Sequence, residues 1–126
     1  MCKTQKANQR AFDKALKHIR QQGKAAVDAN GLCCYKSESG LSCAFAPMIK
    51  QYDEALETYC ASDLICDKNG NLYDWVYDID YRFADQLQSC HDMAFVSADK
   101  SGSPFLPIFE EKMQNLAAEY DLEYHA

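Results

Sequence analysis

The chain of 126 residues has the length and composition of one small folded domain, and its charge is divided unevenly. A hydrophobic fraction of 48% and an aromatic fraction of 12% exclude general disorder. Residues 1–50 hold nine Lys and Arg against three Asp and Glu, whereas residues 51–126 hold four against sixteen, so charges of +6 and −12 sum to the net −6. Because net charge governs association more than fold, we expect this division to concern binding partners.

Residues 1–126 are expected to form a single domain that works inside a cell. No apolar run approaches the roughly 18 residues of a membrane span, and the basic start of the chain lacks the apolar core of a signal peptide. The expected compartment is therefore the reducing cytoplasm. Seven cysteines, an odd number, fit free thiols better than a disulfide scaffold.

The first predicted helix covers residues 4–22 and carries most of the basic charge. Thr4 can cap its start, Gly23 can end it, and its apolar residues recur at helical spacing. Its inner face comprises Ala11, Phe12, Ala15, Leu16 and Ile19. Its remaining positions and the residue before it hold six cations, which make it the basic element of the protein: Lys3, Lys6, Arg10, Lys14, Lys17 and Arg20.

A β-hairpin near residues 31–46 is predicted after this helix. Residues 32–36 and 41–45 are short strand-like runs, and residues 37–40 between them have the Ser and Gly content of a turn. The predicted fold class is therefore α+β and predominantly helical, with about four helices and this one small hairpin.

Three further helices are predicted in the remainder of the chain. One begins at Pro47, whose missing N–H suits a first turn, and ends near Cys60 with an inner face of Ile49, Tyr52, Leu56 and Tyr59. The next begins at Leu72 and extends for more than twenty residues, because its apolar side chains fall within an arc of about 120° on a helical wheel. These side chains are Leu72, Trp75, Val76, Ile79, Phe83, Leu87, Cys90 and Ala94. The last helix begins at Ser103 and Pro104 and buries Ile108, Phe109, Met113, Leu116 and Tyr120.

The exposed side of the helix predicted from Leu72 carries a row of four carboxylates: Asp74, Asp78, Asp85 and Asp92. At about 1.5 Å per residue their spacings are roughly 6, 10 and 10 Å, comparable with successive phosphates along a nucleic-acid strand. Tyr77 lies beside the row and Tyr81 lies within it, and tyrosine supplies contact area at protein surfaces at low entropic cost. These six residues are the predicted partner-binding site.

Two other interpretations of the acidic row stay open. Amphipathic helices routinely expose an acidic face to solvent without any binding role. The basic first helix could also neutralise the row inside the fold. Repulsion between Asp74 and Asp78, together with the poor helix propensity of Asp, favours a functional reason for the pattern.

The cysteines and histidines offer a weaker candidate site. Cys33 and Cys43 lie on opposite arms of the predicted hairpin, and Cys90 and His91 could add zinc ligands, but no C-x-x-C or H-x-x-x-H spacing is present. Nucleophilic catalysis needs a base beside the thiol, whereas Cys90 and His91 point about 100° apart on a helix. We therefore expect buried thiols and no catalytic residue, metal or cofactor. A small thiol- or zinc-dependent protein using Cys33 and Cys43 is the alternative.

Two short motifs resemble a family of small proteins from phages and prophages. The first motif comprises Gly31, Cys33, Tyr35, Gly40, Cys43, Ala44 and Phe45, followed by Met48 and Ile49. The second pairs Leu87 and Gln88 with His91 and Asp92 near the end of a later helix. The chain departs from the family pattern at Ala46, where a Gly usually stands, and in the Asp- and Tyr-rich residues 74–85. The resemblance implies an origin in a mobile element and transfers no chemistry.

The expected function is that of a non-enzymatic, phage-derived binding protein. The acidic row and the resemblance together indicate an inhibitor of a host nucleic-acid-handling or defence complex, comparable to anti-CRISPR proteins, that acts by nucleic-acid mimicry. Its partner would be a host protein complex with a basic surface, met in the host cytoplasm. Direct binding of nucleic acid is not expected because the total charge is negative and the basic helix has Phe12 as its only aromatic residue.

Overall fold

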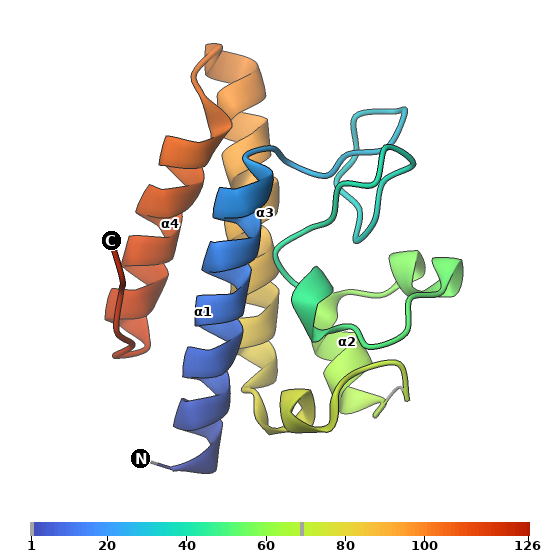
Figure 1. The fold of residues 1–126 in the computed structure, drawn as a ribbon, viewed down its shortest axis with the longest axis vertical. Helices are drawn as coiled ribbons and strands as arrows, with labels where there is room; N and C mark the ends of the chain where they lie inside the picture. Colours follow the sequence, from blue (N-terminus) through green and yellow to red (C-terminus); the bar gives the residue numbers. More distant parts are fainter. Residues whose placement is uncertain (1, 69) are drawn as a thin grey trace.

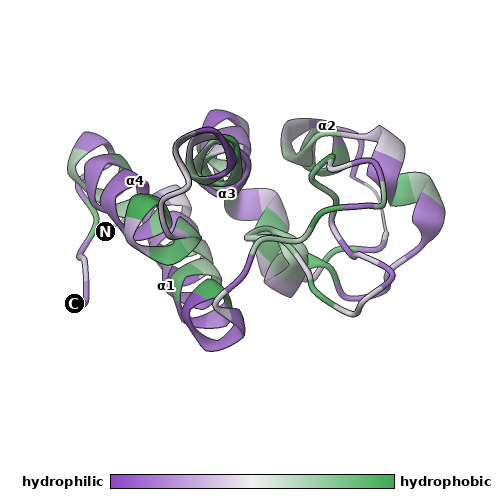
Figure 2. Ribbon diagram, turned by 90° about the horizontal axis from the view of Figure 1, so that it is seen from above, coloured by the Kyte–Doolittle hydropathy of each residue, from purple (hydrophilic) through white to green (hydrophobic). Residues whose placement is uncertain are grey.

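The structure is a computed structural model that describes residues 2–68 and 70–126, in which every regular element is a helix and irregular segments connect them (Figure 1). The α-helices are α1 (Lys3–Gln22), α2 (Ala61–Cys66), α3 (Tyr81–Ser101) and α4 (Phe105–Glu119). Short 3-10 segments are η1 (Ala46–Met48), η2 (Glu54–Thr58) and η3 (Asp74–Asp78). The long helices α1, α3 and α4 pack together, and α2 with most of the chain between α1 and α3 lies on the other side of α3 (Figure 2).

Helix α1 confirms the prediction for residues 4–22 and begins one residue earlier. Cys2 caps its start, because the sulfur accepts a hydrogen bond from the N–H of Gln5 at 3.4 Å. Gly23 ends it in the left-handed conformation with φ of 74°, and its N–H donates to the carbonyl of Ile19. All five predicted inner residues are buried.

The predicted β-hairpin is wrong, and with it the α+β fold class: no β-strand occurs in residues 2–68 and 70–126. The chain does reverse where expected, with one isolated antiparallel bridge between Lys36 and Ser42. A ladder does not extend from it because side chains take the backbone N–H groups instead. Glu57 accepts from Tyr35 and Lys36, and Gln22 accepts from Ser42.

The helix predicted from Pro47 to Cys60 is also wrong. Pro47 lies in the short segment η1, and Ile49 then turns to an extended conformation with ψ of 117°. The next N–H groups, those of Lys50 and Gln51, both donate to the carbonyl of Asn71, so they belong to a contact with a distant segment rather than to a helix. The six-residue helix α2, which begins after Cys60, was not predicted.

The long helix predicted from Leu72 is divided into η3 and α3. Asp80 interrupts it: its carboxylate caps α3 by accepting from the N–H of Arg82 at 2.8 Å, and its own N–H donates to Asn8 of α1 at 3.1 Å. Of the eight predicted inner residues, all but the half-buried Trp75 are buried. The pattern of burial was therefore predicted although the helix was not.

Helix α4 confirms the last predicted helix and completes the core, although two of its predicted buried residues, Ile108 and Tyr120, are only half-buried. Four fully buried rings fill its centre: Phe12, Phe45, Phe83 and Phe109. The tail after α4 runs along α1, where Gln5 donates to the carbonyls of Tyr120 and Asp121 and Arg20 donates to that of His125. None of the described helices combines the length and hydropathy that a membrane span requires.

Candidate functional site

Residues 53–81, here called the acidic region, concentrate the negative charge of the molecule. The region holds eight Asp and Glu against one cation, Lys68. It comprises η2, α2, η3 and their connections, on the side of α3 opposite α4 (Figure 1). Five of its carboxylates are exposed: Asp53, Glu54, Asp63, Asp67 and Asp74.

Tyrosine rings stand exposed among these carboxylates. The exposed fractions of Tyr59, Tyr73 and Tyr81 are 44%, 43% and 48%, and these are three of the six large hydrophobic side chains that are exposed in the described chain. An exposed tyrosine ring costs solvation free energy that binding would recover, and it brings a hydroxyl for hydrogen bonding. The acidic region is therefore the part of the described surface where charge and aromatic area coincide.

The predicted row of four Asp on one helix does not form. Asp74 and Asp78 belong to η3, whereas Asp85 and Asp92 belong to α3, and the break at Asp80 separates the two pairs. The spacing of 6, 10 and 10 Å assumed a continuous α-helix. A different arrangement of carboxylates therefore carries any phosphate mimicry.

Asp85 and Asp92 are engaged in contacts within the fold. The carboxylate of Asp85 accepts a hydrogen bond from the N–H of Ser62 at 2.8 Å, which fixes the start of α2 against α3. Asp92 accepts from Gln88 and His91, at 3.0 and 2.8 Å. Both carboxylates are half-buried, so their first role is structural.

The four other predicted residues lie in or next to η3 and differ in exposure. Asp74 and Tyr81 are exposed, whereas Tyr77 and Asp78 are half-buried. Lys3 of α1 pairs with Asp78 at 3.4 Å, and the guanidinium of Arg10 lies 4.4 Å from the centre of the Trp75 ring. The basic helix thus neutralises part of η3, but the exposed carboxylates of η2 and α2 have no such ion pair among the described residues.

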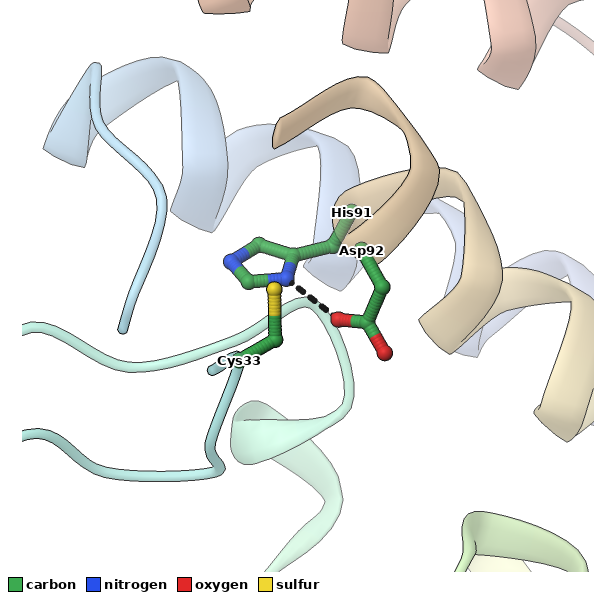
Figure 3. Close-up of side chains that lie close together, drawn as sticks. All are labelled: Cys33, His91 and Asp92. Atoms are coloured by element: carbon green, nitrogen blue, oxygen red, sulfur yellow. Dashed lines mark hydrogen bonds and ion pairs between the residues drawn. The ribbon is translucent and has the colours of Figure 1, made fainter. Parts of the chain in front are cut away.

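A second cluster brings together Cys33, His91 and Asp92, whose ligand-type atoms all lie within 4.8 Å of one another. His91 and Asp92 extend from α3, and Cys33 reaches them from the irregular segment after α1 (Figure 3). Cys43 and Cys90, the other cysteines of the predicted thiol or zinc site, do not join a metal-binding group among the described residues. The cluster therefore lacks two of the predicted members, Cys43 and Cys90, and adds Asp92.

Hydrogen bonds fix the protonation of the buried His91 ring. Its Nε2 lies 3.0 Å from the N–H of Ala26, which can only donate, so Nε2 must accept. The ring proton of the neutral imidazole is therefore on Nδ1, where it is donated to Asp92. Neither nitrogen is left to take a proton from Cys33 or to bind a metal ion, since a metal ligand needs a free nitrogen lone pair.

The thiol of Cys33 is held in its protonated form. Burial, followed by the charge of Asp92 and its hydrogen bond from the thiol, raises the pKa of Cys33 to about 12. Nucleophilic catalysis and zinc binding both use the thiolate. The donor set thus fits neither a zinc ion nor a cysteine nucleophile, and the cluster is best explained as a structural contact.

Gln88, His91 and Asp92 together form a clamp that attaches the segment between α1 and η1 to α3. Gln88 accepts from the N–H of Phe45 at 3.2 Å, His91 accepts from that of Ala26, and Asp92 lies beside the thiol of Cys33, with their ligand-type atoms within 4.8 Å. The spacing of three and four residues places the three side chains on one face of the helix. The sequence shows this spacing, but it does not show which segment of the chain the three side chains bind.

The two motifs of the phage resemblance meet at this clamp. The first motif includes Cys33 and Phe45, whereas the second supplies Gln88, His91 and Asp92. The hydrogen bond from the N–H of Phe45 to Gln88 joins residues of the two motifs.

We expect the stability of the protein to fall above pH 9 through Cys33. The pKa of Cys33 is about 12 in the fold against an ordinary 9.0, so the unfolded chain loses this proton first. The contribution is thus complete below pH 9 and is lost as the pH rises towards 12. Urea unfolding of the wild type and of Cys33→Ser measures it: the difference in unfolding free energy should be constant from pH 7 to 8.5 and decline from pH 9 to 11. A constant difference across the whole range would contradict it.

Comparison with known proteins adds no assignment: no protein-family model matches the chain, and no curated protein or solved structure is significantly similar to it.

Proposed function

We propose that this protein is a non-enzymatic binding protein whose acidic region docks onto a basic surface of a partner protein. The observation that carries the proposal is the composition of residues 53–81: five exposed carboxylates and three exposed tyrosines accompany a single cation. Carboxylates in this density raise the association rate with a basic surface, and tyrosines supply the contact area that then excludes water.

The basic surface would be one that otherwise holds nucleic acid. Such surfaces present arginine and lysine for phosphates and often aromatic rings for bases, and the acidic region offers a complement to both. The resemblance to phage proteins adds a setting, in which the partner is a host nucleic-acid-handling or defence complex and the protein acts as its inhibitor. The thiol- or zinc-dependent alternative lacks comparable support because of the protonation of His91 and Cys33.

The experiment is retention of bacterial lysate proteins on the immobilised protein at low salt. The test variant is Glu54→Gln, Asp63→Asn, Asp67→Asn and Asp74→Asn, four exposed residues whose side chains make no hydrogen bond or ion pair within the described fold. The wild type should retain nucleic-acid-binding proteins that elute as salt rises, because exposed charges are screened beyond about 0.1 M. The variant should lose at least tenfold of this retention.

A matched control separates the acidic region from net charge. Glu38→Gln, Asp99→Asn, Glu111→Gln and Glu123→Gln remove four exposed charges elsewhere and also change the net charge from −6 to −2. This control should retain the same proteins as the wild type. Equal retention by the wild type and the acidic-region variant would refute the proposal, and equal losses in both variants would reduce it to a non-specific charge effect.

A further inference from the structure

Five cations form a continuous stripe along the exposed face of α1, here called the basic stripe: Lys3, Lys6, Arg10, Lys14 and Lys17. Their spacing of three and four residues keeps them on one side of the helix. The stripe extends over about 21 Å at 1.5 Å per residue. The charge division seen in the sequence is therefore also a division between two surfaces.

One half of the basic stripe contacts an acidic and aromatic segment of the same chain while staying exposed. Lys3 pairs with Asp78, and Arg10 stacks on Trp75, both in η3. Helix α1 and η3 are packed against each other here. The structure thus shows which chemistry this stripe accepts: carboxylates against its charges and aromatic rings against its guanidinium.

The other half of the stripe borders an open hollow of about 340 Å³. Lys14 and Lys17 line it from α1, and Ser42, Ala46 and Pro47 line it from the facing segment. Neither lysine has an ion pair among the described residues. The hollow offers two charges for carboxylates and a small apolar floor against which a tyrosine ring can pack.

We propose that the occupant of this hollow is the acidic region of a second copy of the chain. The exposed carboxylates and tyrosines of the region repeat the chemistry, a carboxylate and an aromatic ring, with which its own η3 segment contacts the other half of the stripe. A nucleic acid carries phosphates without cations of its own and would meet a molecule of net charge −6, whereas a second copy of the same net charge also carries 13 cations beside its carboxylates. The acidic region of a second copy concentrates the negative charge that complements Lys14 and Lys17.

The contact is heterologous, because the acidic region and the hollow are different surfaces of one chain. Such contacts continue from copy to copy and produce open, head-to-tail oligomers. Self-association would also cover the acidic region and compete with the partner of the proposed function. The inference uses the same acidic region as that function but does not depend on the identity of its partner.

Sedimentation velocity at about 0.02 M and about 0.5 M salt tests the inference. The wild type should form oligomers that grow with concentration at low salt and dissociate at high salt. Lys14→Glu with Lys17→Glu should be monomeric at both. The matched control, Lys24→Glu with Lys50→Glu, also changes two exposed lysines and brings the net charge to the same −10, and it should associate like the wild type.

A mixing experiment tests the head-to-tail geometry. The Lys14→Glu, Lys17→Glu variant keeps its acidic region, and the variant with Glu54, Asp63, Asp67 and Asp74 neutralised keeps its hollow. Each should be monomeric alone, and the mixture should give a one-to-one dimer that cannot grow further. A wild type that stays monomeric at low salt, a lysine variant that associates normally, or a mixture without dimer would each overturn the inference.

The lysate experiment keeps this inference separate from the proposed function. The Lys14→Glu, Lys17→Glu variant should retain partner proteins at least as well as the wild type, because its acidic region is intact and uncovered. If this variant no longer self-associates but retains partner proteins normally, the result supports both the self-association and the proposed function. Retention by a wild type that never self-associates would overturn the inference alone.

Discussion

Replacing His91 by Ala is expected to lower the free energy of unfolding by about 3 kcal/mol, the largest effect we predict for a single residue. The ring is fully buried, accepts the N–H of Ala26 and donates to Asp92. It also makes an edge contact with Phe105, at 5.7 Å between ring centres. Truncation therefore leaves a buried N–H without an acceptor and a cavity beside it. Urea unfolding at neutral pH measures the change.

Two comparisons make this result specific to the clamp. His91→Gln should recover part of the loss, since its side-chain oxygen can again accept the N–H of Ala26. His125→Ala, at an exposed position in the tail, should change the unfolding free energy by less than about 0.5 kcal/mol. A loss below about 1 kcal/mol for His91→Ala would show that the segment between α1 and η1 is held by other contacts.

Glu57→Ala should destabilise the fold by about 2 kcal/mol. The carboxylate accepts from the N–H groups of Tyr35 and Lys36, at 2.8 and 3.1 Å, and from the hydroxyl of Tyr52 at 2.6 Å. Its removal deprives two backbone groups of their acceptor in the segment that was expected to pair as a hairpin. Hydrogen exchange of those two amides should accelerate together with the loss of stability.

The control for Glu57 is its neighbour Glu54. Glu54 is exposed, makes no side-chain hydrogen bond within the described fold and lies in the same 3-10 segment. Glu54→Ala should therefore leave stability within about 0.5 kcal/mol of the wild type. Equal effects of the two substitutions would mean that the acidic charge of η2, and not the three hydrogen bonds, determines its stability.

The long helices could be predicted because their signals are local. The apolar spacing and Gly23 define α1, and the buried pattern from Phe83 to Ala94 defines most of α3. The same apolar pattern continues back to Leu72, but the chain there is not α-helical. The 3-10 segment η3 and the extended residue after it also bring Val76 and Ile79 into the core. Periodicity reports burial, and Asp80 acted as a cap that the periodicity did not reveal.

The segments without long helices could not be predicted, since their hydrogen bonds are made to distant side chains. The strand-like residues near Tyr35 bond to Glu57, and Phe45 bonds to Gln88. Strand propensity measures the fit to a neighbouring strand, which this chain does not supply. Of the candidate site, the acidic and tyrosine content was evident, but the roles of Asp85 and Asp92 depend on contacts with Ser62 and Cys33.

Competition with DNA tests most directly the central claim, that the acidic region occupies a nucleic-acid-binding surface. A partner protein retained from the lysate is bound to labelled duplex DNA, and this protein is then added at constant salt. We expect the added wild-type protein to displace the DNA from the partner. The variant with Glu54, Asp63, Asp67 and Asp74 neutralised should need an at least tenfold higher concentration for the same displacement. A ternary complex of partner, DNA and this protein would contradict the claim.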